Sequence, residues 1–199
     1  GDPMSYPDKI NVPGPNMLTV EWVRSTGSHS VAELGVYLGQ TSVEIASCLG
    51  SGDSLDLFDF EGVVERAAEK ARAVSSCTLR THANSYRLRD SYAWSLKKLL
   101  EMHEQPIWDY VFIDGAHTWD VDGFAFLLCD MLLKPGGYMD LDDYHWTLDS
   151  SEALRDFPTT LNCYTSEQRA EKQVAAVAEL LVKRRGYSAV VPEKIYRKP

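Results

Sequence analysis

The stretch SVAELGVYLGQTSVEIASCL, residues 30–49, decides the fold class, because it joins a short apolar strand to a helix through a glycine turn. Its first five residues suit a buried strand. Glycines at positions 35 and 39 allow a tight turn and a close approach of the backbone to a ligand. Apolar side chains at Val43, Ala46 and Leu49 then follow helical spacing. We therefore expect a strand, a turn and a helix in succession.

The same alternation continues along the chain. Further strands are predicted at residues 54–60, 77–83, 108–114 and 137–143, with one or two more within 187–198. Helices are predicted at residues 17–24, 61–74, 91–103, 121–132 and 166–186, the fourth stopped by KPGG and the last capped by Gly186. Alternating strands and helices predict an α/β fold: a doubly wound, mostly parallel Rossmann-like sheet with helices on both faces, in a single domain.

Length and composition agree with one domain. The chain has 199 residues, of which 44% are hydrophobic. We expect residues 1–30 to form an N-terminal extension, with a cloning scar at 1–3, and residues 31–199 to form the domain. No apolar run is long enough to span a bilayer and no secretory leader is evident, so we expect a soluble, cytoplasmic protein without a membrane partner.

The net charge and the cysteines argue against particular partners and sites. The formal net charge of −9 argues against nucleic acid as the main partner, because binding phosphates requires a basic face. The four cysteines are scattered without a CxxC pair, so we expect reduced thiols rather than disulfides or a zinc site.

Polar residues follow the predicted strands at the edge where a doubly wound sheet binds ligands. These residues are Glu33 to Gly39, Asp59, Asn84 and Ser85, Asp114 to His117, and Asp142 to His145. Together they predict a site along one rim of the sheet.

The first turn indicates a nucleotide-type pocket. It differs from the dinucleotide pattern GxGxxG, because Tyr37 stands where a second glycine would be, so a pyrophosphate ligand is disfavoured. About twenty residues on, Asp59 ends the second strand, where a carboxylate accepts hydrogen bonds from ribose hydroxyls. Asp56 is the alternative if that strand ends earlier.

Three carboxylates are expected to meet at the other half of the rim. Asp114 ends one strand, and Asp142 with Asp143 ends its predicted neighbour. Such a cluster raises the pKa values of its members and favours a bound cation, and oxygen ligands suit Mg²⁺ or a similar divalent ion. The metal would lower the pKa of a substrate hydroxyl, and His117, three residues after Asp114, is the candidate base that takes the proton.

Four segments together resemble the class I S-adenosylmethionine-dependent methyltransferases. They are ELGVYLGQTSVEIA, LFDFEG, YVFIDGAHTW and LLKPGGYMDLDDYHW, and the resemblance covers roughly residues 31–146. More narrowly, they resemble the small-molecule O-methyltransferases related to the macrocin and other antibiotic-sugar enzymes. The resemblance implies a cofactor pocket that takes in the turn with Val36 and Tyr37 and is bordered by Asp114. Within it, Glu33, Gly35 and Gly39 border the methionine part, Asp59 the ribose, and Asn84 or Ser85 the adenine surroundings.

The resemblance also supports the metal and the base. In catechol O-methyltransferase and in metal-dependent antibiotic-sugar methyltransferases, metal ligands stand at the positions of Asp114, Asp142 and Asp143. The base in some of these enzymes falls where His117 is. Some relatives carry an aspartate proposed as the base two residues after the first ligand, and this chain has Ala116 there. His117 then remains as the base, with His145 as the weaker alternative.

Other functions stay open at this point. They are a metal-independent methyltransferase that works by orientation with His117 as base, a nucleotide-sugar-binding transferase whose DLDD segment binds metal and diphosphate, and a non-catalytic cofactor-binding module. The acceptor is expected to be a small hydroxylated molecule such as a sugar, phenol or natural product. Residues before Val31 and residues 143–164 should form most of its pocket wall, with Trp119 and Trp146 covering adenine or substrate. So short a lid is also compatible with a homo-oligomer that completes the site.

Overall fold

The structure, a computed structural model, describes residues 14–199. It contains a seven-stranded sheet in the order β3-β2-β1-β4-β5-β7-β6. The strands are β1 (Ser30–Leu34), β2 (Ser54–Phe60), β3 (Thr78–Asn84), β4 (Trp108–Ile113), β5 (Leu133–Leu141), β6 (Ser188–Val191) and β7 (Ile195–Arg197). The first five strands are parallel, whereas β7 pairs antiparallel with both β5 and β6. The predicted doubly wound, mostly parallel α/β fold is confirmed.

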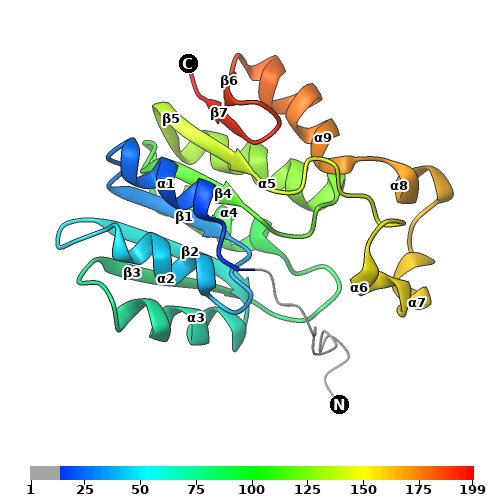
Figure 1. The fold of residues 1–199 in the computed structure, drawn as a ribbon, viewed down its shortest axis with the longest axis horizontal. Coiled ribbons are helices and arrows are strands. Elements are labelled where there is room, and N and C mark those ends of the chain that lie inside the picture. Colours follow the sequence, from blue (N-terminus) through cyan, green and yellow to red (C-terminus); the bar gives the residue numbers. More distant parts are fainter. Residues whose placement is uncertain (1–13) are drawn as a thin grey trace.

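Helices cover both faces of this sheet (Figure 1). The longer ones are α1 (Met17–Ser25), α2 (Gln40–Ser47), α3 (Val63–Arg72), α4 (Tyr92–Met102) and α5 (Trp119–Leu132). Short helices follow β5: α6 (Glu152–Arg155), α7 (Pro158–Leu161), α8 (Ser166–Ala170), α9 (Gln173–Ala176), the π-helical η1 (Val177–Val182) and the 3-10 helix η2 (Lys183–Arg185). In the described residues no helix combines the length and the apolar character that crossing a bilayer requires.

Two hydrophobic clusters, one on each face, fix the sheet between its helices. One cluster takes buried side chains from α1, α2 and α3, such as Val20, Ile45 and Ala68. The other takes them from α4, α5 and η1, such as Leu96, Phe126 and Val177. Helix α1 lies in the predicted N-terminal extension and packs into the first cluster with residues of the domain. The proposed boundary at residue 30 stays a prediction, and the predicted cloning scar lies outside the described residues.

Two local expectations differ from the structure. The KPGG segment, predicted as a stop, is part of β5, which begins at Leu133 directly after α5. The helix predicted at residues 166–186 is interrupted: α8 ends at Ala170, Glu171 takes an extended conformation, and α9 begins at Gln173. The interruption has a physical cause, because the Gln173 side chain turns inward, accepts a hydrogen bond from the Trp119 backbone N–H and donates one to the Gln168 carbonyl. The predicted cap is correct, since Gly186 ends η2 in the left-handed conformation.

Candidate functional site

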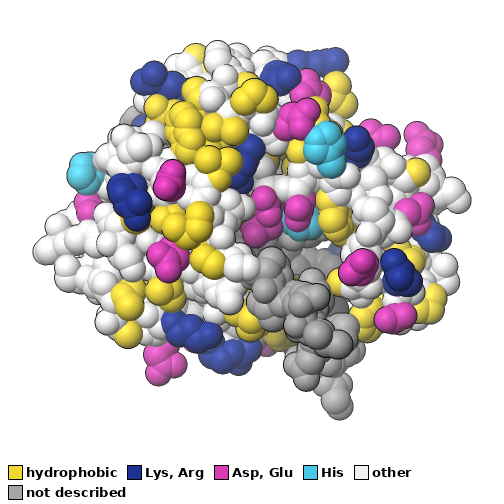
Figure 2. All heavy atoms as spheres, in the orientation of Figure 1, with side chains coloured by type: hydrophobic (Ala, Val, Ile, Leu, Met, Phe, Trp, Pro, Cys, Tyr) yellow, Lys and Arg dark blue, Asp and Glu magenta, His cyan; other side chains and the backbone are white. Residues whose placement is uncertain are grey.

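The carboxyl ends of the parallel strands bring the predicted polar residues to one rim. Parallel pairing aligns Leu34 at the end of β1 with Phe58 of β2 and with Ile113 of β4, and aligns Ile113 with Leu141 of β5. The segments that follow these strands therefore meet. Figure 2 shows acidic and histidine side chains gathered beside a hollow near the middle of the face that it presents.

The turn between β1 and α2 is tightly fixed to its neighbours. The backbone N–H groups of Val36 and Tyr37 both donate to Oδ2 of Asp59, at 2.8 and 3.1 Å. Gly35 has φ +90°, and a Cβ atom there would lie 2.0 Å from the carbonyl oxygen of Asp114. Only glycine allows this approach, so the turn and the end of β4 are held in contact.

Glu33, at the inner end of this turn, is buried and accepts a 2.6 Å hydrogen bond from the Ser42 hydroxyl of α2. Burial raises the pKa of Glu33 to about 8, against the effect of that hydrogen bond. The carboxyl is therefore mostly protonated at neutral pH, and it would gain from a cation placed against it.

The ribose and adenine candidates occupy the ends of β2 and β3. Asp59 is 8% exposed, and its Oδ1 accepts a hydrogen bond from the Phe60 backbone N–H. Asn84 is buried, and the Ser85 backbone N–H donates to Asp90. The rings of Phe60 and Tyr86 stack with centroids 4.6 Å apart, a pair that sequence reasoning did not single out. Asp56, the alternative to Asp59, is fully buried and occupied with other partners, as described below.

Beside this turn, Asp114, His117 and Asp143 form a compact cluster. His117 Nε2 lies 3.0 Å from Asp143 Oδ2 and 3.8 Å from Asp114 Oδ1. One donor atom from each of the three residues lies within 4.8 Å of the other two, as in a group that holds a metal ion. The side chains of His117, Asp114 and Asp143 are 16%, 34% and 45% exposed, so the cluster is open on one side.

The charges in this cluster shift one another. Burial and the neighbouring carboxylates of Asp142 and Asp143 raise the pKa of Asp114 well above its ordinary value. Burial alone would lower the pKa of His117, but the hydrogen bond to Asp143 and the charge of Asp114 raise it to about 8. A bound cation would relieve the repulsion between these carboxylates.

Asp142, predicted in the same ligand set, contacts Asp114 and also has partners outside the cluster. Its Oδ1 accepts a 3.1 Å hydrogen bond from the Asn16 side chain and lies 3.7 Å from Lys194 Nζ. Lys194 Nζ also lies 2.9 Å from Asp140 Oδ1, and Asp140 is fully buried. The structure therefore brings Asp142 to the rim but directs one of its oxygens away from the cluster.

Three residues that support this half of the site were missed by sequence reasoning. Asp122, buried in the first turn of α5, accepts hydrogen bonds from the backbone N–H groups of Ala116 and His117 and holds the loop after β4. An acid in the first turn of a helix was the available signal for Asp122. Asn16 caps α1, and Lys194 lies between β6 and β7; neither carries a local signal for a role at the rim.

The other candidates near the rim have less direct positions. His145, the alternative base, is 61% exposed, and its ring nitrogens lie 2.5 Å from Glu193 Oε2 and 3.1 Å from Lys172 Nζ. The Trp146 ring packs edge-on against His117 with centroids 5.0 Å apart, so it covers one side of the cluster. Trp119, at the start of α5, is exposed.

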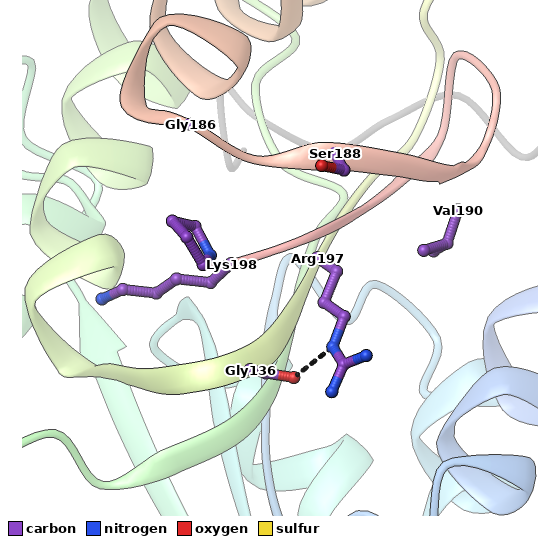
Figure 3. Close-up of a pocket in the computed structure, with 7 residues that line it drawn as sticks. Gly136, Gly186, Ser188, Val190, Arg197 and Lys198 are labelled. Atoms are coloured by element: carbon purple, nitrogen blue, oxygen red, sulfur yellow. Dashed lines mark hydrogen bonds between the residues drawn. The ribbon is translucent and has the colours of Figure 1, made fainter.

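Two hollows lie away from this rim. One, of about 480 Å³, lies against the β6–β7 edge, where Arg197 donates to the Gly136 carbonyl (Figure 3). The other, of about 500 Å³, lies between β3 and α4 and is lined by side chains such as Arg80, His82 and Lys98. Neither hollow contains a residue predicted for the site.

Comparison with known proteins places this geometry in context. A family model described as a methyltransferase domain matches residues 32–144. Among solved structures, an O-methyltransferase from Bacillus cereus in complex with SAH is 17% identical, with a TM-score of 0.64 over 96% of this chain and 84% of the other. The O-methyltransferase TomG from Streptomyces achromogenes, involved in tomaymycin synthesis and solved with SAM, is 17% identical, with a TM-score of 0.62 over 92% and 78%. SAH-bound PaMTH1, a methyltransferase from Podospora anserina, is 13% identical, with a TM-score of 0.55 over 90% and 75%. These structures show the shared fold. Among curated protein sequences, none is significantly similar to this chain.

Proposed function

This chain belongs to the family of methyltransferase domains, and we propose from that premise that it transfers a methyl group from S-adenosylmethionine to a hydroxyl of a small molecule. One observation carries the proposal: the glycine turn fixed by Asp59 lies against the end of β4, next to Asp114, His117 and Asp143. A methyl donor in the turn and an acceptor hydroxyl at the cluster would then be neighbours, and such positioning is the main requirement of methyl transfer. The solved structures with SAM or SAH bound support this choice of cofactor.

The residues of the proposed cofactor pocket fit the cofactor chemically. Glu33 is a buried carboxyl that would gain from the ammonium of the methionine part, next to the Gly35–Gly39 turn with Val36 and Tyr37. Asp59 is held by three backbone N–H groups and would present its remaining acceptor capacity to the ribose hydroxyls. For the adenine we propose the surroundings of Asn84 and Ser85.

The acidic half of the rim would hold a divalent metal. Its donor set fits a cation, because Asp114 and Asp143 repel each other and His117 Nδ1 is buried without a hydrogen-bond partner among the described residues. When bound, such an ion lowers the pKa of a coordinated hydroxyl and orients it. We keep Asp114, Asp142 and Asp143 as the proposed metal ligands. We propose a divalent ion there, of which the predicted Mg²⁺ is one.

His117 would activate the acceptor hydroxyl from this position. The sequence predicts that it takes the proton directly, which requires a free ring nitrogen facing the acceptor. The same position also allows it to bind the metal. The two roles differ in a measurable way, because removing a base leaves metal affinity intact.

Calorimetric titration of S-adenosylmethionine and S-adenosylhomocysteine, with a divalent metal and then with a chelator, tests the proposal. We expect micromolar binding of both. Replacing Asp59 by alanine should weaken both at least tenfold, whereas Asp53→Ala, at the opposite end of β2, should not. The same protein, with methyl-labelled cofactor, is then screened for label transfer to diols, phenols and sugars.

Each alternative predicts its own result in this experiment. Transfer that survives the chelator would favour the metal-independent methyltransferase. Binding of a nucleotide sugar in place of the cofactor would favour the transferase, and cofactor binding without transfer to any hydroxyl compound would favour a binding module. Absence of cofactor binding would refute the proposal.

A further inference from the structure

The hollow between β3 and α4 has the size of a ligand site. Its volume is about 500 Å³, and small-molecule sites usually measure roughly 300–1,000 Å³. It opens at the side of the sheet, because β3 is the outermost strand there. Its lining extends to His103, at the end of α4, and to Ile107, just before β4. None of the residues proposed for the cofactor or the metal lines it, so the hollow is separate from the proposed active site.

The charge of this hollow is opposite to that of the whole chain. The protein has a formal net charge of −9. Among the described residues, however, no aspartate or glutamate lines the hollow, and the basic side chains that line it are Arg80, His82, Lys98 and His103. A concave surface lined by one sign of charge attracts ligands of the opposite sign. The hollow therefore favours an anion.

Two of the basic side chains are held in place from beneath the hollow. Asp56, fully buried in β2, accepts hydrogen bonds from Arg80 Nε and Nη2 at 2.9 and 3.0 Å and lies 2.8 Å from His82 Nε2. The His82 ring also stacks on Phe58, with centroids 4.4 Å apart. The contact with Asp56 does not use Arg80 Nη1, and the Arg80 side chain is 47% exposed. A ligand would therefore meet a wall that is already ordered, which lowers the entropic cost of binding.

Lys98 is the second cation that an anion would meet. Asp56 offsets much of the Arg80 charge, so Lys98, exposed on α4, adds most of the remaining attraction. A hydrogen bond from the Ser85 backbone and, more weakly, the Lys98 charge lower the pKa of Asp90, which does not line the hollow. The preceding residue, Lys97, lies 2.6 Å from Glu101 and does not line the hollow either. Two neighbouring lysines of one helix therefore differ in their relation to this hollow.

The lining also has an apolar part. Leu99 is buried, Ile107 is half-buried, and Met102 is 72% exposed. An apolar group placed here would remove part of the Met102 side chain from water, which is favourable. An inorganic anion would leave that surface wet. The lining therefore fits an anionic group attached to an apolar or aromatic body.

We propose that the hollow between β3 and α4 is a second binding site, which takes a small amphipathic anion. A carboxylate or phosphate group would lie against Lys98 and Arg80, and its apolar body would lie against Leu99, Met102 and Ile107. Ammonium and guanidinium groups bind both kinds of anion. The inference does not depend on the proposed methyltransferase activity.

Nuclear magnetic resonance titration of the ¹⁵N-labelled full chain tests this site. The probes are benzoate, phenyl phosphate, inorganic phosphate and the uncharged benzyl alcohol. We expect benzoate or phenyl phosphate to bind saturably, with a dissociation constant of about 1 mM or less and with shift changes concentrated in β3 and α4. Inorganic phosphate and benzyl alcohol should bind about fivefold more weakly or worse, because each lacks one half of the required chemistry. The tighter of the two aromatic anions identifies the anionic group that the site prefers.

The two neighbouring lysines provide a matched pair of variants. Lys98→Met should weaken binding of the tighter probe about fivefold or more, whereas Lys97→Met, with the same change of charge, should alter it less than about twofold. Met102→Ser should weaken binding of the aromatic anions and leave that of inorganic phosphate unchanged. All three positions are exposed, so the variants should fold, and thermal unfolding by circular dichroism checks this. Arg80 is not substituted, because its loss would also disturb the buried Asp56.

Several results would overturn the inference. They are the absence of saturable shifts in β3 and α4, equal effects of the two lysine variants, and binding of benzyl alcohol or inorganic phosphate as tight as that of the aromatic anions. Shifts confined to residues 33–39 would place the probe in the proposed cofactor pocket and would refute a second site as well.

Discussion

Replacing Asp56 by asparagine should destabilise the protein strongly and in a pH-dependent way. Asp56 is fully buried in β2, and its two oxygens accept hydrogen bonds from Arg80 Nε and Nη2 at 2.9 and 3.0 Å, from His82 at 2.8 Å and from Trp108 at 2.9 Å. Burial alone would raise its pKa, but the hydrogen bonds from these three side chains lower it from the ordinary 3.8 to about 2. A difference of that size corresponds to about 2.5 kcal/mol of folding free energy.

The lowered pKa of Asp56 sets the direction in which stability changes with pH. The charged form is favoured by folding, so this stabilisation is fully present above the unfolded pKa of about 4 and is lost as the pH falls toward 2. At pH 7, Asp56→Asn should cost about 2–3 kcal/mol, because three side chains lose a charged hydrogen-bond acceptor in the core, while the half-exposed Arg80 can still be solvated. Between pH 5 and pH 2.5 the difference between wild type and variant should shrink by about 2 kcal/mol.

Urea unfolding followed by circular dichroism at a series of pH values measures this difference directly. Glu104→Gln is the control, since Glu104 is exposed and its removal should change stability by no more than about 0.5 kcal/mol. A difference between wild type and Asp56→Asn below about 1 kcal/mol at pH 7, or one independent of pH, would show that this buried network is not the stabilising unit described here.

Three further predictions concern the rim. Gly35→Ala should destabilise the protein by about 1–3 kcal/mol or more in urea unfolding, because φ is +90° and the new Cβ would lie 2.0 Å from the Asp114 carbonyl oxygen. Gly50→Ala is the control, since the space around Gly50 is open. Equal losses of stability in the two variants would refute the contact. The pKa of Glu33 is raised to about 8, so the free energy of unfolding of the wild type should fall as the pH rises from about 4.5 to 8, by up to about 1.4 kcal/mol per pH unit. The free energy of unfolding of Glu33→Gln should depend less on pH over that range. The same pH dependence in both proteins would contradict a buried neutral carboxyl. Asp122→Ala should lower the free energy of unfolding by about 1–3 kcal/mol and weaken binding of the proposed metal, because two backbone N–H groups of the loop after β4 lose their acceptor. Unchanged metal affinity would show that the loop needs no such support.

The strands could be predicted from the sequence because their signals are local. β1 and β2 match the predicted residues 30–34 and 54–60, since apolar runs bounded by glycine or turn residues leave little freedom in where a strand ends. The interruption of the predicted helix at residues 166–186 depended on a tertiary contact, the hydrogen bond from Trp119 to Gln173, which no periodicity reveals. The capping box of Thr165 and Gln168 marks the start of α8, which agrees with the predicted start at residue 166, but it gives no sign of the break after Ala170.

Some features of the site likewise follow from local sequence, and others depend on residues that are distant along the chain. Alternation along a strand predicts that Asp142 and Asp143 point in different directions, and Asp143 departs further because its φ is +66°. Sequence spacing does not say which of the two faces the end of β4, since that depends on what lies on the other side. Here the other side is Lys194, which the β6–β7 hairpin brings back to β5 from more than fifty residues along the chain. A lysine in a turn after an antiparallel strand has no motif of its own, yet its Nζ lies 3.7 Å from Asp142. The surroundings of the carboxylates at this rim are therefore set by sheet topology as well as by the DLDD segment.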